Sequence, residues 1–400
     1  MANLWFYNIP YHGHINPTLP LVRELIARGD AVTYFAGPAF QERIRATGAE
    51  PRSYSNLDAF GQSRDSSHLI HQGALVAESA NALLGEVLAA VEAERPDLLM
   101  FDMSAPWGAI ASRRFDIPAI ASFPHLPFYW RTLTDDPRVL RKAMASLRPG
   151  LGHWRALARQ TANIAREHSL RNPADVNVLS SAAELNIVFL TRYFQPHAAH
   201  FDDSYVYVGP TIDTTRPETP MDIRKGPDQK LIYIAVGTLY RANLAFFQAC
   251  MEAFADPAYA VIMSVGKAVD PDALIPIPDN FTVAQFVPQL QILRTADVFI
   301  THGGMNSINE AVTFDVPMVV VPNTVEQSIN AARIEQLQCG VYLDHAQLSV
   351  ETLRASVSQV LTDPAASSGL ERLRASFEEA GGVQLAADVI GRFKEKHGIG

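Results

Sequence analysis

The chain has 400 residues, of which 48% are hydrophobic and 19% charged, and its formal net charge is −9. This length predicts two domains, and this mixture is typical of globular domains that bury large cores. An acidic chain is a poor candidate for binding nucleic acid or an anionic membrane surface.

The start of the chain and its cysteines indicate where the protein works. The strand-like run Leu4–Ile9 has no basic segment and apolar stretch before it, so we expect no signal peptide. The longest apolar runs, such as Val316–Pro322, have the length of strands and are too short to cross a bilayer. Cys250 and Cys339 form no CxxC motif, which argues against a disulfide framework or a zinc knuckle. We therefore expect a cytoplasmic protein without stable membrane insertion, and its oligomeric state stays open.

Strand-like and helical segments alternate along the first half of the chain. The apolar runs predict buried strands at Leu4–Ile9, Ala31–Phe35, Leu98–Phe101 and Ala119–Ser122. Amphipathic stretches predict helices between them at Leu19–Arg28, Phe40–Thr47, Leu75–Ala93 and Trp107–Arg114. The segment Pro127–Leu170 differs, because it is helical, rich in aromatic residues and arginine, and lacks a strand.

The second half repeats the alternation, with strands expected at Leu231–Val236, Ala260–Val265, Val298–Thr301 and Met318–Val321. Alternation of this kind predicts an α/β fold with parallel sheets covered by helices on both faces. Two doubly wound, Rossmann-like domains would then face each other across a cleft lined by the carboxyl ends of the strands.

The boundary between these domains is marked by Gly-Pro, Arg-Pro and Thr-Pro pairs in the polar stretch Gly209–Lys230. We therefore expect an acceptor-binding domain at 1–212, a linker at 213–230 and a nucleotide-binding domain at 231–380. For the C-terminal helix in 381–400, packing back on the N-terminal domain and packing on the other domain are both open.

The most informative motif is the run from Thr301 to Glu310, where a strand passes into a helix through two glycines. Such a turn exposes backbone N–H groups at the positive end of the helix dipole, which suits a diphosphate. His302 and the N–H groups of Gly304, Asn306 and Ser307 could hold phosphates, and Glu310 could accept the hydroxyls of a ribose. The plain structural alternative is a glycine-rich helix start with a capping network.

Two further segments extend this pattern. Gly237-Thr238 follows the strand Leu231–Val236 and offers another hydroxyl and N–H group. Phe286-Val287-Pro288-Gln289 follows a strand as well, so an aromatic face could stack a base while backbone groups read its edge. Together these segments favour a nucleotide-sugar site.

A separate constellation lies in the first half. His12 and His14 occupy the loop after the first strand, and Asp102 closes the strand Leu98–Phe101 at the same carboxyl edge. A histidine there could remove a proton from an acceptor hydroxyl, oriented by a carboxylate. The structural alternatives are a histidine satisfied by backbone groups and an aspartate that caps the following helix.

These motifs together resemble the GT-B glycosyltransferases, in particular the bacterial macrolide and flavonoid glycosyltransferases that use UDP-sugars. The resemblance extends over nearly the whole chain and includes His12-Gly13-His14-Ile15-Asn16-Pro17 and the run from Pro322 to Gln327. It implies His14 as the base and Asp102 as its partner.

The same resemblance implies roles for the donor residues. Phe286 would stack on uracil with Val287 and Gln289 beside it, His302 and Ser307 would contact the diphosphate, and Glu310 the ribose. Glu326 and Gln327 would hold the hydroxyls of the transferred sugar. No cofactor or metal is required, since the helix N-terminus and His302 neutralise the leaving diphosphate. The alternative is a cation held by His12, His14 and Asp102, with His125 as a further available ligand, and this chemistry disfavours it.

The expected activity is inverting transfer of a hexose, glucose from UDP-glucose, to a hydroxyl of a hydrophobic small molecule such as a macrolide, a flavonoid or another phenolic. Aromatic residues that would line the acceptor pocket are Tyr11, Phe60, Phe123–Trp130 and the helices within Leu140–Leu170, with His125 and Trp130 as individual candidates. The alternatives are a UDP-sugar epimerase of the same architecture and a non-catalytic nucleotide-sugar-binding subunit.

Overall fold

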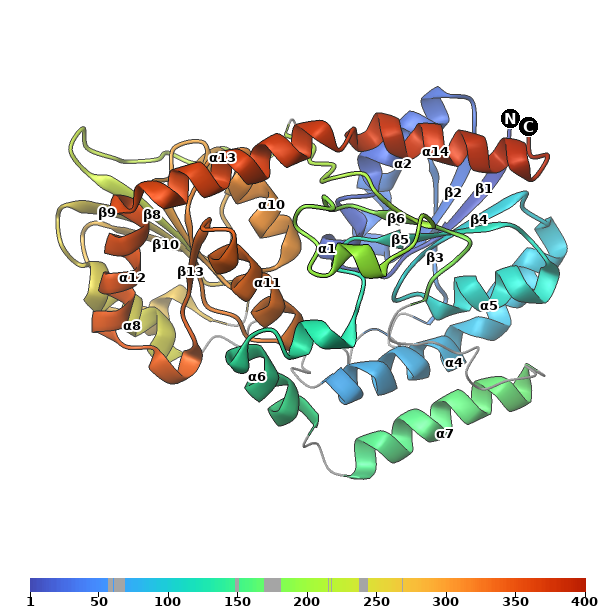
Figure 1. Cartoon of the computed structure of the whole chain (residues 1–400), viewed down its shortest axis with the longest axis horizontal. Coiled ribbons are helices and arrows are strands. Elements are labelled where there is room, and N and C mark those ends of the chain that lie inside the picture. Colours follow the sequence, from blue (N-terminus) through green and yellow to red (C-terminus); the bar gives the residue numbers. More distant parts are fainter. Residues whose placement is uncertain are drawn as a thin grey trace. The chain divides into compact units, whose positions relative to one another are not determined.

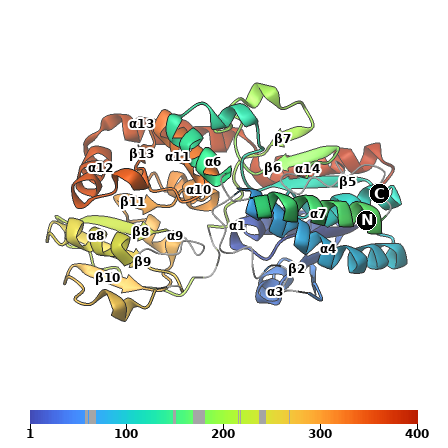
Figure 2. The ribbon, with the colours of Figure 1, turned by 90° about the horizontal axis from the view of Figure 1, so that it is seen from below.

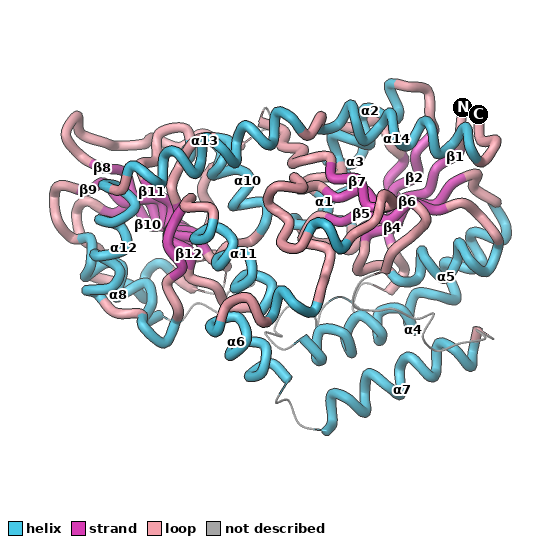
Figure 3. Tube along the Cα trace, viewed as in Figure 1, coloured by secondary structure: helices cyan, strands magenta, loops and turns pink. Residues whose placement is uncertain are grey.

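The computed structural model describes residues 1–56, 60, 69–147, 151–168, 181–214, 216, 218–236, 244–267 and 269–400. The chain divides into two compact units, each built on one parallel sheet. The first unit comprises residues 1–132, 143–212 and 376–400, and the second comprises 133–142 and 213–375. Figure 1 labels the elements, and Figure 3 shows helices on both faces of each sheet.

The first unit contains a seven-stranded sheet in the order β3-β2-β1-β4-β5-β6-β7, in which all neighbours are parallel. Its strands are β1 (Asn3–Tyr7), β2 (Ala31–Ala36), β3 (Glu50–Ser53), β4 (Leu98–Asp102), β5 (Ala119–Phe123), β6 (Leu185–Val188) and β7 (Tyr205–Tyr207). The helices of this part are α1 (His12–Ile15), α2 (Leu19–Ala27), α3 (Gln41–Arg45), α4 (Leu69–Glu94), α5 (Pro106–Phe115), α7 (Leu151–Glu167) and α14 (Gly382–Lys396).

The second unit contains a six-stranded parallel sheet in the order β10-β9-β8-β11-β12-β13. Its strands are β8 (Lys230–Ala235), β9 (Tyr259–Ser264), β10 (Phe281–Ala284), β11 (Val298–Thr301), β12 (Met318–Val320) and β13 (Gly340–Tyr342). Its helices are α8 (Leu244–Phe254), α9 (Gln289–Leu293), α10 (Met305–Thr313), α11 (Val325–Gln336) and α12 (Val350–Thr362). The division between the units falls within α6 (Pro137–Leu147) and α13 (Pro364–Glu379).

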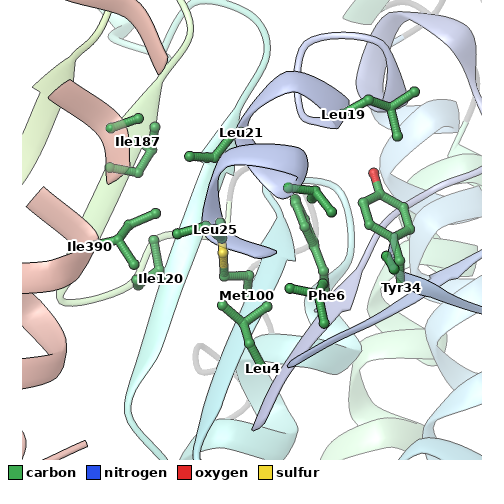
Figure 4. Packing of buried hydrophobic residues seen from close by; sticks show 14 of the residues in the cluster. Leu4, Phe6, Leu19, Leu21, Leu25, Tyr34, Met100, Ile120, Ile187 and Ile390 are labelled. Atoms are coloured by element: carbon green, nitrogen blue, oxygen red, sulfur yellow. The ribbon is translucent and has the colours of Figure 1, made fainter. Parts of the chain in front are cut away.

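The central strands form because their residues are apolar on both faces. All five residues of β4 and all five of β5 are buried, as a parallel sheet covered by helices requires. One face of the first sheet packs against α2 and α14 in a single hydrophobic cluster, and Figure 4 shows Leu4, Met100 and Ile120 of the strands meeting Leu25 and Ile390 of the helices. The sheets thus have the doubly wound form that the sequence predicts.

The sequence pattern missed β6 and three of the four edge strands, β3, β7 and β13. The edge strand β3 has the sequence Glu-Pro-Arg-Ser, and none of its residues is fully buried. A proline cannot donate to a neighbouring strand and is therefore confined to edges, where no apolar run is needed. The edge strands β7 and β13 have three residues each, which is too short for a recognisable period.

Residues 213–230, expected as a linker, pack against the second unit in their described part. The backbone N–H of Met221 donates to Gln291 Oε1 at 3.0 Å, and Lys225 Nζ lies 2.6 Å from Asp297 Oδ2. The segment is therefore a part of the second unit that lies along α9.

The helix α4 contains a window, Ile70–Glu94, that by length and composition alone would suffice to cross a membrane. The strand-sized apolar runs considered in the sequence are thus not the longest apolar segments in the described part of the chain. Half of the most apolar stretch of this helix is buried, and α4 packs against α5 and α7; Figure 2 shows α7 alongside it. Its apolar character is accounted for by this packing within the first unit.

The C-terminal helix α14 packs on the first unit. Ala386, Ala387, Ile390 and Phe393 enter the hydrophobic cluster of the first sheet. Around them Arg28 Nη1 lies 2.6 Å from Asp388 Oδ1, and Lys394 Nζ lies 2.6 Å from the buried Asp30 carboxylate. Because this buried carboxylate would be left without a cation if Lys394 moved away, the ion pair holds the C-terminal end of α14 against the first unit.

We expect Ile390→Ala to lower the free energy of unfolding by about 2–5 kcal/mol, because a fully buried side chain would leave a cavity between α14 and the sheet. Urea denaturation measures this loss. Arg392→Ala, on the exposed side of the same helix, should change stability by less than about 0.5 kcal/mol. Equal losses in the two variants would contradict the packing of α14 described here.

Candidate functional site

Both sheets reverse their strand order at one point, and several of the predicted site residues follow the strands at that point. In the first sheet the reversal lies between β1 and β4, and in the second it lies between β8 and β11. At such a switch point the loops leaving two neighbouring strands diverge to opposite faces and leave a crevice at the carboxyl edge. His14 and Asp102 follow the first pair, and His302 to Glu310 follow the second.

At the first switch point His14 and Asp102 are in direct contact. His14 lies in α1, just after β1, and its Nδ1 is 2.9 Å from Oδ2 of Asp102, the last residue of β4. The Asp102 side chain is fully buried and that of His14 is 12% exposed. A carboxylate buried in this way needs hydrogen-bond donors, and His14 supplies one of them.

The surroundings hold this pair in one arrangement. The other carboxylate oxygen of Asp102 accepts from the backbone N–H of Ser104 at 2.8 Å. Asn8 Nδ2 donates to the carbonyl oxygen of His14 at 3.2 Å and to the hydroxyl of Tyr34 at 2.7 Å. Because a carboxylate can only accept, the His14 proton sits on Nδ1 and leaves Nε2 as a base.

The second histidine of the loop has different partners. His12 is exposed, its Nδ1 lies 3.3 Å from Nη1 of Arg43, and its ring packs edge-on against Phe40. His125 instead packs against His14, with the two ring centroids 4.4 Å apart. Of the two histidines that the sequence left open, His14 contacts the carboxylate of Asp102.

The residues expected to line an acceptor pocket separate into two groups. Phe123 is fully buried in β5, and Phe60 packs against Tyr54 and Trp107, so both belong to the core. Tyr11 donates its hydroxyl to the Phe60 carbonyl oxygen at 3.0 Å. Phe128 and Trp130 are exposed, as expected for residues that could meet a ligand.

At the second switch point two glycines shape the start of α10. Gly303 has a φ of +82°, and a Cβ there would lie 2.6 Å from Val320 Cγ1, so the turn requires glycine. Gly304 is the N-cap residue and has no side chain to satisfy the first N–H groups of the helix. Asn306 and Ser307 follow in the first turn, both partly exposed. The helix start can therefore receive an anion.

His302 lies over this turn. Burial lowers its pKa, against the opposing effects of the Glu326 charge and a hydrogen bond with the backbone of Ala235. The imidazole is therefore neutral at pH 7 and can donate from one nitrogen only. Its Nδ1 is buried and has no hydrogen-bond partner in the described part of the chain.

Glu310 differs from the expectation of an open ribose ligand. Its side chain is 5% exposed, and Nη1 of Arg216 lies 2.6 Å from its Oε1. Its Oε2 accepts from Arg216 Nη2 at 3.2 Å and from Gln289 Nε2 at 2.7 Å. Gln289, expected beside the base, thus reaches the carboxylate, and the hydroxyl of Tyr233 donates to its Oε1 at 3.0 Å.

Arg216 is the site residue that the sequence reasoning missed. It stands 94 positions before Glu310 in a stretch that reads as a linker, and no local motif marks it. Burial alone would lower the pKa of its guanidinium, but the charges and hydrogen bonds of Glu310 and Glu218 outweigh it and raise that pKa. Arg216 is thus permanently charged.

The two residues expected to hold the donor sugar have internal partners as well. Gln327 completes a capping box with Thr324, and its Oε1 accepts from the backbone N–H groups of Asn323 and Thr324 at 2.8 and 3.1 Å. Glu326 accepts from Asn330 Nδ2 at 2.9 Å. The amide oxygen of Gln327 is therefore committed to the start of α11, while its amide N–H₂ group can still donate.

The remaining donor residues differ in position. Phe286 is 54% exposed, and Lys267 Nζ lies 5.8 Å from the centre of its ring. Val287 is partly exposed beside it. Thr238 lies outside the described residues.

Within the described ranges no three or more His, Cys, Asp or Glu side chains are grouped so as to hold a metal ion.

Comparisons with known proteins agree on one class. Residues 249–382 match the family described as "Erythromycin biosynthesis protein CIII-like, C-terminal domain". The NDP-glycosyltransferase YjiC of Bacillus licheniformis is 34% identical, and the match covers 98% of each chain. The oleandomycin glycosyltransferase of Streptomyces antibioticus is 29% identical over 97% of this chain and 90% of its own.

Two solved structures are similar over the full length. The glycotransferase of kitacinnamycin has a TM-score of 0.82 and 29% identity, with 98% of both chains covered. The calicheamicin glycosyltransferase CalG4 has a TM-score of 0.80 and 26% identity, with 99% of this chain and 98% of the other covered.

The two doubly wound parallel sheets and these structural neighbours define a glycosyltransferase of GT-B architecture, an enzyme that transfers a sugar. The chain belongs to the family of bacterial glycosyltransferases that includes YjiC and the macrolide glycosyltransferases.

We expect Gly304→Ala to weaken the binding of UDP about tenfold, because a Cβ at this position would lie 2.5 Å from His302 Nε2 and displace the ring. Isothermal titration calorimetry of the purified variant measures this change. Gly152→Ala is the matched control, since a Cβ there meets no atom within 4 Å. An unaltered affinity for UDP in Gly304→Ala would remove this turn from the donor site.

Proposed function

We propose that the protein is an inverting, metal-independent glycosyltransferase of the cytoplasm that moves glucose from UDP-glucose to a hydroxyl of a hydrophobic small molecule. The observation that carries this proposal is the contact between His14 Nδ1 and the buried carboxylate of Asp102. This contact leaves Nε2 as a base that can take a proton from an acceptor hydroxyl.

In the proposed reaction, the acceptor hydroxyl transfers its proton to Nε2 of His14. Its oxygen attacks the anomeric carbon with the electron pair of the broken O–H bond. The bond between that carbon and the diphosphate oxygen breaks as the new bond forms on the opposite face, so the configuration inverts. Asp102 remains ionised and stabilises the imidazolium that appears. UDP leaves with the electron pair of the broken bond.

The donor residues would stabilise this leaving group. The N-terminus of α10, which has no side-chain cap, offers N–H groups to the diphosphate, and His302 beside this turn would contact it too. The exposed ring of Phe286 can stack on the base, while Glu310 lies near enough to the turn to serve the ribose. The N–H₂ group of Gln327 and the free electron pairs of Glu326 would hold hydroxyls of the sugar.

The acceptor class is proposed from two observations. Phe128 and Trp130 present large apolar surfaces to solvent, which favours a flat or hydrophobic aglycone. Two relatives are named as glycosyltransferases of oleandomycin and of zeaxanthin. A macrolide, a flavonoid or another phenolic is the acceptor we propose.

We expect His14→Ala to lower kcat by about 10²–10⁴-fold, because the variant lacks the base, while the affinity for UDP stays unchanged. Turnover with a phenolic acceptor and titration with UDP measure the two quantities separately. His12→Ala, in the same loop and with its Nδ1 beside Arg43, should retain most of the activity. Full turnover by His14→Ala would refute the base assignment.

A screen of macrolide, flavonoid and simple phenolic acceptors with UDP-glucose, read by mass spectrometry, should give products heavier by one hexose. Proton NMR of the product should show a β-linked sugar. An α-linkage would contradict inversion. An incubation with UDP-glucose alone is the control, and conversion of the donor there into a different UDP-sugar would indicate an epimerase.

A further inference from the structure

The carboxylate of Glu310 is already occupied by protein donors in this structure. Among the described residues, three N–H groups donate to it: two from Arg216, at 2.6 and 3.2 Å, and one from Gln289, at 2.7 Å. A carboxylate offers about four acceptor positions, two on each oxygen. Oε2 receives two of these donors and Oε1 receives one, so a single position on Oε1 is left.

A ribose diol would need more than this. The 2′ and 3′ hydroxyls of a ribonucleotide each require an acceptor if both are to bond to Glu310, whereas a 2′-deoxyribonucleotide needs one acceptor for its 3′ hydroxyl. With Arg216 in place, the carboxylate can satisfy the deoxyribose completely and the ribose only in part. The 2′ hydroxyl of a nucleotide therefore adds little to its affinity for this site.

Arg216 is held in place on two sides. Its Nη2 also lies 3.4 Å from Oε1 of Glu218. The Glu218 carboxylate in turn accepts from the backbone N–H groups of Leu290 and Gln291, at 3.2 and 3.1 Å, at the start of α9. Since α9 packs against α10, which carries Glu310, the guanidinium bridges the two elements. Moving it would leave the buried Glu310 without its cation, which is costly.

We propose that Arg216 is a specificity-determining residue of the donor site, which limits Glu310 to one sugar hydroxyl and so makes the enzyme nearly indifferent to the 2′ hydroxyl of the donor nucleotide. The chain would accordingly accept 2′-deoxyribonucleotide sugars as well as ribonucleotide sugars. This inference rests on the proposed contact between Glu310 and the ribose.

The test compares UDP with dUDP, which differ only at the 2′ position, in calorimetric titrations of the full chain. The wild type should bind the two within about threefold. Arg216→Lys keeps a positive charge but lacks the two-pronged guanidinium, so it should free one acceptor position on Glu310. The ratio of the affinity for UDP to the affinity for dUDP should then rise about tenfold over the wild-type ratio, because one hydrogen bond to a charged acceptor is gained. Arg216→Ala should shift the ratio in the same direction, and a thermal melt establishes that each variant is folded.

Arg224→Ala is the matched control, because Arg224 lies in the same segment, pairs with Asp222 at 3.1 Å and has an 87% exposed side chain. It should leave the ratio unchanged. A folded Arg216→Lys variant with the wild-type ratio would overturn the proposal. An equal rise in the affinities for UDP and dUDP would overturn it too. Arg216 would then only obstruct access to Glu310, without selecting between the two nucleotides.

The variant Glu310→Ala tests separately whether Glu310 contacts the ribose. If that variant binds both nucleotides as the wild type does, Glu310 does not contact the ribose, and the inference about Arg216 falls with it. If Glu310→Ala weakens binding while the Arg216 variants keep the wild-type ratio, the inference alone fails. Glycosyl transfer itself is tested independently by the turnover of His14→Ala.

Discussion

Parallel pairing of strands is the constraint on which both candidate sites depend. β1 pairs with β4, and β8 with β11, so the loops that follow these strands emerge at one edge of each sheet. The strands can pair in this way only because helices cover both faces, which in turn requires apolar side chains throughout. Asp102, His14 and His302 therefore lie at strand ends or just after them, where a loop meets a buried core.

The two sites use a buried carboxylate in different ways. Asp102 is paired with His14, whose second ring nitrogen is the atom that we propose to accept a proton. Glu310 is paired with Arg216, which keeps its charge under all ordinary conditions, so this pair is a fixed arrangement of donors and acceptors. The first pair is the basis of the proton transfer that we propose, and the second is the basis of the proposed selection among donor nucleotides.

The sequence predicted the central strands well, since β11 spans Val298–Thr301 as expected and β2, β4 and β5 differ by one residue at an end. These strands are apolar along their whole length, which is a local property. The edge strands β3, β7 and β13 lie at borders with water and carry no such signal. The packing of 213–230 against α9 was missed for a similar reason, because a segment rich in proline and polar residues reads as a linker until its partners are known.

The sequence by itself determined the features that depend on neighbouring residues, such as the Gly303-Gly304 turn at the start of α10 and the order of histidines and carboxylates along the chain. The tertiary structure decided which of these groups meet. His14 and Asp102 are 88 positions apart, and Arg216 and Glu310 are 94 apart, so only the packing of distant segments could bring them within hydrogen-bonding distance. The same packing buried Glu310, and burial is a property of the folded chain that no single segment contains.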